Sequence, residues 1–203
     1  MLSDINNTAE ENTNGSNIVV ISGPSGVGKS TICAELVQRI DSAFLSVSVT
    51  TRSSGAGEVN GKDYWFVSKE QFQERIENDD FLEYAEVFGN LYGTSRTETK
   101  KAMAEGKSVI LEIDVQGGLL VKKVFKDAKM IFILPPVQGD LAERINGRAR
   151  GEGAKATRER LENASQETAK AWQYYEYMII NDDLEQAVRE IVQIIQRKIG
   201  ENQ

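Results

Sequence analysis

One segment restricts the fold more than any other: the eight residues GPSGVGKS, from Gly23 to Ser30, directly follow a short apolar stretch. They match the pattern G-x-x-x-x-G-K-[ST], and a helical pattern follows from Lys29 to Ile40. A buried strand, a glycine-rich turn and a helix in this order create an anion-binding nest at a helix N-terminus. The segment therefore predicts a bound nucleoside triphosphate and a parallel sheet around it.

Four apolar runs separated by helical patterns predict the rest of that sheet: residues 17–22, 108–114, 130–134 and 177–180. Runs without polar alternation are typical of parallel strands that helices cover on both faces. The expected fold class is therefore α/β, a P-loop three-layer α/β/α parallel sheet. Between the runs, strand-like pieces at 45–51, 64–67 and 81–88 break the rhythm. They predict an inserted mixed α+β subdomain.

Local signals place several helix ends. Ser68 and Gln71 form a capping-box pattern that opens a helix. Gly106 is expected to end the helix over 97–105, and either Asp182 or Asp183 is expected to cap the C-terminal helix. Two more helical patterns cover 138–148 and a stretch that runs from about 158 to 176.

Composition excludes several kinds of chemistry. The 203 residues include no histidine, which removes imidazole bases, Ser-His-Asp triads and His-bound zinc. The net charge of −7 opposes general nucleic-acid binding, and no apolar run approaches the length of about 18 residues that spans a membrane. Cys33 is the only cysteine, which fits a reducing compartment. We therefore expect a cytoplasmic protein without nucleic-acid or membrane partners, and residues 1–16 as a disordered tail.

A nucleoside triphosphate site alone fits a GTPase, an ATPase motor or a small-molecule kinase. The sequence has no base-reading motif of the NKxD type, and it is short for a motor with accessory domains. A kinase for a small phosphorylated acceptor is the class that remains.

Several segments together point to one family: GPSGVGKST, SVSVTTR, GEVNGKDYWFVS, FLEYAEVFGNLYGTS, LEIDVQG and IINDDL. Their order and spacing closely resemble guanylate kinases, from about Ile18 to about Ile199. The phosphate loop alone indicates a superfamily, whereas GEVNGKDY with YGTS is specific to this family. The resemblance implies ATP-dependent phosphorylation of GMP and dGMP with Mg²⁺ in purine nucleotide metabolism. It also implies one domain at 17–199, with a core at 17–44, 97–140 and 172–199, a GMP-binding subdomain at 45–96 and an Arg-rich helical lid at 141–171.

The resemblance assigns the donor side of the site. The residues matched to ATP binding are Gly23, Pro24, Ser25, Gly26, Val27, Gly28, Lys29, Ser30, Thr31 and, near the donor purine, Asn181. Ser30 and Asp114 match metal-binding positions, Asp114 through a bound water. The expected catalytic residues are Lys29 and the lid arginines Arg144, Arg148 and Arg160, which reach the donor and transferring phosphates, with Arg150 as an alternative to Arg148.

The acceptor side is assigned in the same way. The matched residues are Ser48, Arg52, Tyr64, Glu83, Tyr92, Thr94 and Glu112. Glu83 matches the guanine-reading carboxylate, because one carboxylate can accept hydrogen bonds from both N1–H and the N2 amine. Adenine presents an acceptor at N1, which the same carboxylate would repel. Ser48, Thr94 and Glu112 are expected near the base, and the arginine and the two tyrosines at the phosphate.

The chain departs from the family pattern at one point. Guanylate kinases usually read TTR-x-P-R-x-G-E, whereas this chain has Ser54 and Gly55 in place of the proline and the second arginine. We expect weakened GMP binding, unless Arg96 supplies the missing charge. A positive φ at Gly55 would make a restored arginine strained.

Two other functions stay open at this stage. Guanylate-kinase-like domains also serve as binding modules in scaffold proteins. Such modules generally lose the lysine of the phosphate loop, which this chain keeps as Lys29. A kinase for another nucleotide is the alternative within the same class. The expected partners are ATP and GMP, in a monomer or a homodimer.

Overall fold

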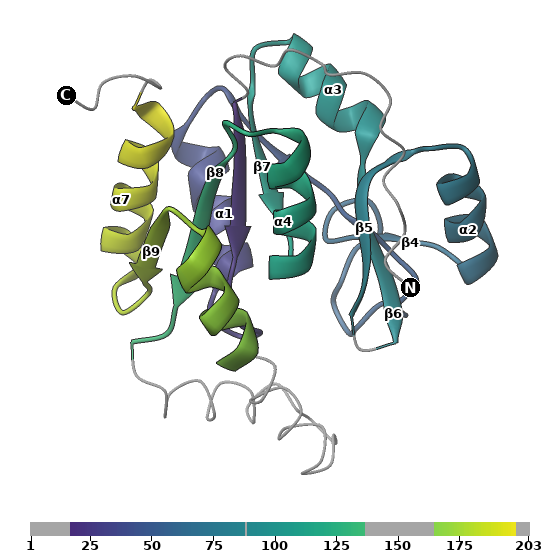
Figure 1. The fold of residues 1–203 in the computed structure, drawn as a ribbon, viewed down its shortest axis with the longest axis horizontal. Helices are drawn as coiled ribbons and strands as arrows, with labels where there is room; N and C mark the ends of the chain where they lie inside the picture. Colours follow the sequence, from purple (N-terminus) through teal and green to yellow (C-terminus); the bar gives the residue numbers. More distant parts are fainter. Residues whose placement is uncertain (1–16, 88, 137–164, 198–203) are drawn as a thin grey trace.

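The computed structural model describes residues 17–87, 89–136 and 165–197, which form two sheets and the helices around them (Figure 1). The predicted tail at 1–16 and the predicted helix at 138–148 lie outside the described residues.

The main sheet has five strands in the order β2-β7-β1-β8-β9, all parallel. The strands are β1 (Ile18–Ser22), β2 (Ala43–Ser46), β7 (Ser108–Glu112), β8 (Lys129–Leu134) and β9 (Tyr177–Ile180). Helices α1 (Lys29–Arg39) and α7 (Leu184–Gln196) cover one face. Helices α3 (Arg96–Ala104) and α4 (Val115–Val124) cover the other, together with the helical residues 165–174.

The central strand β1 shows why both faces must be covered. Its side chains alternate, so that Val19 and Ile21 pack on α1 and α7 while Ile18 and Val20 pack on the α4 side. All four are at most 2% exposed. A strand that is apolar on both faces is stable only between two layers of helices, so the predicted three-layer α/β/α class is confirmed.

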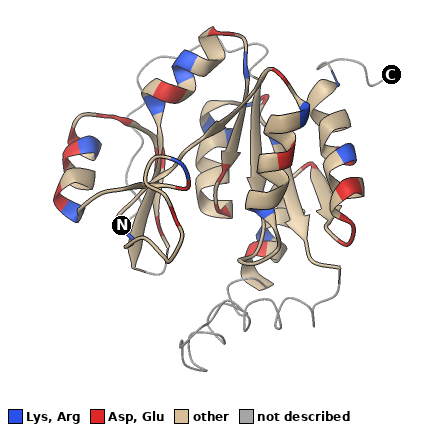
Figure 2. Ribbon diagram, turned by 180° about the vertical axis from the view of Figure 1, so that it is seen from behind, with Lys and Arg blue, Asp and Glu red and all other residues tan. Residues whose placement is uncertain are grey.

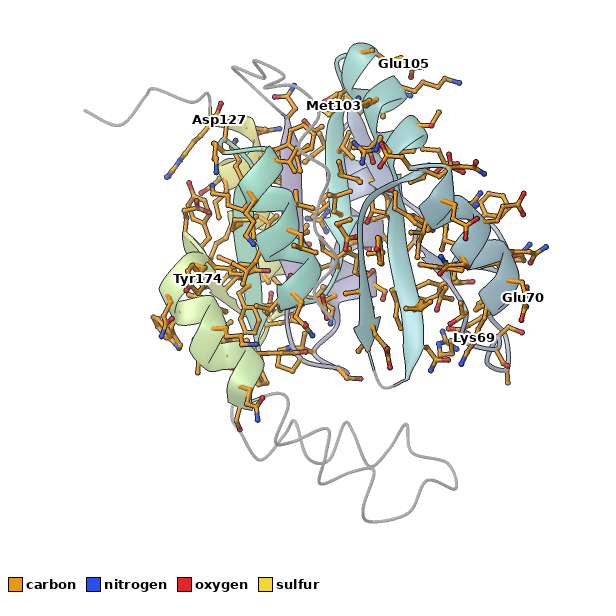
Figure 3. The ribbon with its side chains drawn as sticks, turned by 45° about the vertical axis from the view of Figure 1, so that its right-hand side comes forward. Lys69, Glu70, Met103, Glu105, Asp127 and Tyr174 are labelled. Carbon is orange, nitrogen blue, oxygen red and sulfur yellow. The ribbon has the colours of Figure 1, made fainter. Side chains whose placement is uncertain are left out.

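The second sheet lies beside the main one and has the order β4-β3-β6-β5. Its strands are β3 (Val49–Thr50), β4 (Trp65–Phe66), β5 (Phe81–Val87) and β6 (Asn90–Ser95), and β5 and β6 run antiparallel. Helix α2 (Lys69–Glu77) closes a small core of Val49, Phe72 and Phe81, and Ser68 and Gln71 form the predicted capping box. Figure 3 shows Lys69 and Glu70 at the start of α2, on the side of this sheet away from α4.

Two predicted strands end earlier than expected. The strand predicted over 45–51 is two strands, because β2 ends in the main sheet at Ser46 and β3 begins in the second sheet at Val49. The strand predicted over 108–114 ends at Glu112, because the Asp114 side chain caps α4. Helix α4 occupies the interval between the apolar runs at 108–114 and 130–134, where a helix was expected but no bounds were predicted.

Other local predictions hold. Gly106 follows α3 with a φ of 74°, and Asp183, not Asp182, caps α7 by accepting a hydrogen bond from the Gln186 backbone. The blue and red positions of Lys, Arg, Asp and Glu lie mostly on helices and loops, whereas the strands of the main sheet are largely free of charged residues (Figure 2). Within the described residues, no helix is long and apolar enough to cross a membrane.

Candidate nucleotide site

A cavity of about 630 Å³ lies between the two sheets. The loop between β1 and α1 lines one side, and β5 and β6 line the other with residues near β3. The end of β7 completes the wall with Glu112, Ile113 and Asp114. The parallel strands β1 and β7 thus deliver the phosphate loop and two acids to one edge, as expected at the carboxyl ends of neighbouring parallel strands.

The phosphate loop has the conformation its glycines permit. Gly28 adopts a φ of 101°, and α1 begins directly after it with no acidic residue in its first turn. Lys29 donates hydrogen bonds from Nζ to the carbonyls of Gly23 (2.7 Å) and Pro24 (3.1 Å). The ammonium group therefore lies at the loop, where the helix N-terminus also favours anions.

The structure does not bring every residue of the predicted donor set to the cavity. Ser25, Ser30 and Thr31 line it, whereas the loop residues Pro24 and Val27 are buried and do not. Asn181 is buried at the end of β9, where its Nδ2 donates a hydrogen bond to the Val27 carbonyl (2.8 Å). Asn181 does not line the cavity itself, and its expected contact with the donor purine stays a prediction.

The end of β7 presents oxygen ligands to the loop. The Ser30 hydroxyl donates a hydrogen bond to Glu112 Oε1 (2.8 Å), and Asp114 Oδ1 accepts one from the Gly117 backbone (2.8 Å). Burial raises the pKa of Asp114 above its ordinary value. No cluster of three or more acidic, histidine or cysteine side chains that could hold a metal occurs in the described ranges. A hydroxyl beside carboxylates still fits Mg²⁺, which keeps several waters and takes phosphate oxygens as ligands.

Glu83 is the buried acid of the second sheet. The side chain is 5% exposed, and Oε1 accepts a hydrogen bond from the Thr94 hydroxyl (2.6 Å) across the β5–β6 pair. Burial, together with the charge of Asp114, raises the pKa of Glu83 to about 7, although the hydrogen bond from Thr94 opposes the rise. A carboxylate that is buried at a cavity wall with so few partners is suited to bind donors of a ligand.

A β-bulge aims this acid into the cavity. The pairing of β5 with β6 shifts between Phe81 and Glu83, so that Leu82 has no direct partner. Phe81 packs in the core of the second sheet, Leu82 packs in the main core, and Glu83 faces the cavity. Three consecutive residues are thereby buried in three different environments, which a regular strand would not allow.

The predicted phosphate-binding residues lie together. Arg52 lines the cavity with Tyr64 and Tyr92, and its guanidinium carbon is 5.2 Å from the centre of the Tyr64 ring. Burial raises the pKa of Tyr64 to about 12, so the phenol remains a hydrogen-bond donor at neutral pH. Arg52 makes a two-pronged ion pair with Glu58, with N···O distances of 2.9 and 2.7 Å.

Gly55 stands next to this ion pair. Its backbone N–H donates a hydrogen bond to Glu58 Oε2 (2.5 Å), and a Cβ built on Gly55 would lie 4.0 Å from Arg52 Nη1. The glycine does not have a positive φ, so the strain considered from the sequence is absent. Arg96 does not line the cavity, because its guanidinium pairs with Asp79 (2.9 Å).

Two residues at or beside the site were not predicted from the sequence. Glu58 pairs with Arg52, and the ion pair lowers the pKa of this carboxyl. Glu167 lines the cavity from the helical residues 165–174, and burial raises its pKa to about 7, with Asp114 adding to the rise and Lys29 opposing it. A signal for Glu167 exists, because it precedes the buried Ala171 by four residues and therefore shares its helix face. Figure 3 shows Tyr174 near the end of the same helix.

The remaining predicted residues are partly placed. Ser48, Tyr92 and Glu112 line the cavity, and Thr94 reaches it through its hydrogen bond to Glu83. The lid arginines Arg144, Arg148, Arg150 and Arg160 lie outside the described residues.

A phosphate loop on the central strand of a parallel sheet, facing a second sheet across a cavity, defines a P-loop α/β protein. Comparison with known proteins gives the family. The sequence model of the guanylate kinase family matches residues 15–198, so the chain belongs to that family.

Individual relatives agree with this assignment. A guanylate kinase from Clostridium perfringens is 47% identical over 178 residues, which cover 88% of this chain and 82% of the relative. A guanylate kinase from Synechocystis is 45% identical, with 88% and 92% covered. The crystal structure of guanylate kinase from Anaplasma phagocytophilum superposes with a TM-score of 0.74 at 34% identity, covering 89% of this chain and 85% of that one.

Proposed function

We propose that this protein transfers the γ-phosphoryl group of ATP to GMP, with Mg²⁺ as cofactor. The observation that carries the proposal is the pairing of two unlike binding surfaces across one cavity. The phosphate loop with Lys29 is suited to a triphosphate, and the buried Glu83 opposite is suited to a guanine edge. We also propose dGMP as an acceptor, a role in purine nucleotide metabolism and a cytoplasmic location.

Guanine recognition falls to Glu83 and its neighbours. An ionised Glu83 accepts hydrogen bonds from N1–H and the N2 amine, while Thr94 holds the carboxylate in place through Oε1. Ser48 lines the same cavity and donates to O6. Adenine offers no pair of donors at this edge, so it would leave a buried carboxylate unsatisfied, which opposes binding strongly.

The acceptor phosphate binds at Arg52, Tyr64 and Tyr92. Arg52 is well suited because its planar fork matches two phosphate oxygens. The fork is engaged by Glu58 in the structure, so the incoming phosphate must share or displace that carboxylate. Tyr64 donates its phenolic hydrogen, which burial keeps in place.

The metal and the donor phosphates meet at the loop. Ser30 would hold Mg²⁺ through its hydroxyl, which now donates to Glu112, and Asp114 would bind the hydrated ion through a water. When bound there, the ion supplies charge neutralisation and alignment of the β- and γ-phosphates. Lys29 reaches the same phosphates once its own hydrogen bonds to the loop carbonyls are exchanged.

The reaction needs no general base from the protein. The acceptor is a phosphate monoester, whose second pKa is about 6, so its attacking oxygen is already an anion at neutral pH. Catalysis then depends on alignment and on charge stabilisation of a loose transition state. We assign this to Lys29 and to the lid arginines Arg144, Arg148 and Arg160.

An acceptor panel tests the proposal. Wild-type protein with ATP and Mg²⁺ is assayed against GMP, dGMP, AMP, CMP and UMP, together with Glu83→Gln and the control Glu86→Gln. Glu86 is exposed on the same strand, so its substitution changes charge without touching the cavity. We expect GMP and dGMP to be used, AMP at least about 10³-fold worse, and GMP use to fall sharply only in Glu83→Gln. Equal turnover of AMP and GMP by the wild type would contradict the proposal.

A further inference from the structure

The carboxylate of Glu83 lies against the first turn of α4 with almost no room to spare. A Cβ built on Gly117 would lie 2.7 Å from Glu83 Oε2 and 3.2 Å from Glu83 Cδ. A Cβ essentially never approaches another heavy atom to within 3.0 Å, so any side chain at this position would have to displace something. The nearest atoms belong to the acid that we assign to guanine recognition.

The two oxygens of this carboxylate face neighbours on two different elements. Oε1 accepts the short hydrogen bond from Thr94 on β6, and Oε2 approaches the bare Cα of Gly117 on α4. Helix α4 itself is fixed by Asp114, whose Oδ1 accepts the Gly117 N–H at 2.8 Å. The carboxylate therefore cannot move away from a methyl group on Gly117 without straining the hydrogen bond with Thr94.

We infer that Gly117 is a specificity-determining residue, which positions the guanine-reading carboxylate by leaving the space that its Oε2 occupies. The inference rests on the proposed function of Glu83. It predicts that Gly117→Ala weakens GMP binding. Helix propensity alone predicts that the same substitution stabilises the protein, because alanine is favoured over glycine inside a helix. Gly117 is not required by backbone conformation, since its φ is not positive.

The neighbouring glycine shows that the two positions differ. A Cβ on Gly118 would meet the Tyr175 hydroxyl, Val20 Cγ1 (3.1 Å) and Met130 Cε (3.2 Å). These contacts belong to the main core, so Gly118 is kept small by packing. Gly117 instead faces Glu83 and Asp114 at the cavity. The two adjacent glycines of α4 are thus small for different reasons, Gly118 because of core packing and Gly117 because of the carboxylate that binds the ligand.

Steady-state kinetics and thermal melting of Gly117→Ala test the inference, with Gln116→Ala as the control. Gln116 is exposed on the same helical turn, and its substitution also raises helix propensity. We expect Gly117→Ala to raise KM for GMP by at least about tenfold, because a charge-assisted hydrogen bond is misaligned. KM for ATP should stay within about twofold, and Gln116→Ala should leave both KM values unchanged.

A double variant tests whether Gly117→Ala acts by crowding the Glu83 carboxylate or by disturbing the packing in general. Glu83→Asp shortens the acid by one methylene and withdraws it from Gly117. In that background, adding Gly117→Ala should change KM for GMP by less than about twofold, a clear failure of additivity. If Gly117→Ala does not fold, the double variant should fold as Glu83→Asp does, and a double variant that also fails to fold would overturn the inference.

The outcomes distinguish the proposed function from the role of Gly117. A wild type that does not prefer GMP contradicts the proposed function, whatever Gly117→Ala does. A wild type that prefers GMP, combined with a folded Gly117→Ala variant of unchanged KM for GMP, overturns the role of Gly117 alone.

Discussion

Glu83 must be charged to read guanine, yet its surroundings favour the neutral form. Its pKa of about 7 lies above the second pKa of the GMP phosphate, which is about 6. Because only the ionised carboxylate accepts both guanine donors, kcat/KM for GMP should fall below about pH 7. A profile that bends only near pH 6 would assign the titration to the substrate.

Thr94 allows this explanation to be tested directly. Its hydrogen bond lowers the pKa of Glu83, so Thr94→Val should move the bend in the pH profile of kcat/KM for GMP to a higher pH. Thr97→Val is the control, because Thr97 is exposed at the start of α3. The expectation fails if both variants show the wild-type profile.

Gly55 gives a second prediction at the scale of one residue. Restoring the arginine adds a cation beside Arg52 and Glu58, where a Cβ meets Glu58 Oε2 at 3.1 Å. A charge-assisted contact is worth about 1.5–3 kcal/mol, so Gly55→Arg should lower KM for GMP by roughly 10- to 150-fold. KM for ATP should stay nearly constant.

The control for this variant is Gly55→Gln, which adds length without charge. A folded Gly55→Arg variant with the wild-type KM for GMP would show that the missing arginine is already compensated. Arg96 is not that compensation in the described structure, since it pairs with Asp79 and does not line the cavity.

At the scale of elements, the phosphate loop depends on β9 as well as on β1. The Asn181 amide supports the loop by donating to the Val27 carbonyl, and its Nδ2 lies 2.6 Å from the place of a Cβ built on Gly28. Asn181→Ala leaves a buried carbonyl unpaired, which destabilises by about 1–3 kcal/mol. We expect a lower melting temperature and a larger rise in KM for ATP than in KM for GMP.

Ile180→Ala serves as the matched control, because Ile180 is the neighbouring residue of β9 and is 57% exposed. It should leave both KM values unchanged. A variant Asn181→Ala whose two KM values rise equally would indicate general loosening and not a support of the donor loop.

The elements differ in how far sequence could predict them. The apolar runs and the loop pattern predict the main sheet, because a strand that is buried on both faces is a continuous run of apolar residues. The bounds of helix α4 were not predicted, because Gly117 and Gly118 lower helix propensity, and both glycines are explained only by what they face in three dimensions. The β-bulge at Leu82 has no sequence signal of its own, yet it aims Glu83.

The site shows the same division. Motif resemblance gathered Arg52, Tyr64, Glu83 and Tyr92 correctly around one cavity, although their individual roles stay predictions. It could not predict the pairing of Arg52 with Glu58, because loop geometry decides which acid reaches the guanidinium. Glu167 required the knowledge that its helix packs against the cavity.

At the scale of the whole molecule, two carboxyl groups of the site lower the stability of the folded protein when they ionise. Glu83 and Glu167 each have a pKa of about 7 in the folded protein, against an ordinary value of 4.5. The folded state therefore binds protons more tightly than the unfolded state at these two groups. Their contribution to stability is complete below about pH 4.5 and is lost as the pH rises through 7.

Glutamine variants should reveal this loss. A shift from 4.5 to about 7 corresponds to at most about 3 kcal/mol for each carboxyl. Glu83→Gln cannot ionise, so it should melt several degrees above the wild type at pH 8, at about 2–4 °C per kcal/mol for a chain of this size. The difference should shrink as the pH is lowered to 5.5, where the wild-type carboxyl is protonated.

The variant Glu86→Gln is the control for the predicted pH dependence of the melting temperature, because it removes an acid whose carboxyl is exposed. Glu86 is exposed on the same strand, so its variant should follow the wild-type melting temperature at every pH. Glu167→Gln should behave as Glu83→Gln does, because burial is the main cause of the raised pKa at both positions. A stability difference between Glu83→Gln and wild type that stays constant from pH 5.5 to 8 would contradict the raised pKa of Glu83. A difference that grows with pH would show that this fold gives up stability at neutral pH to keep a charged acid at the cavity.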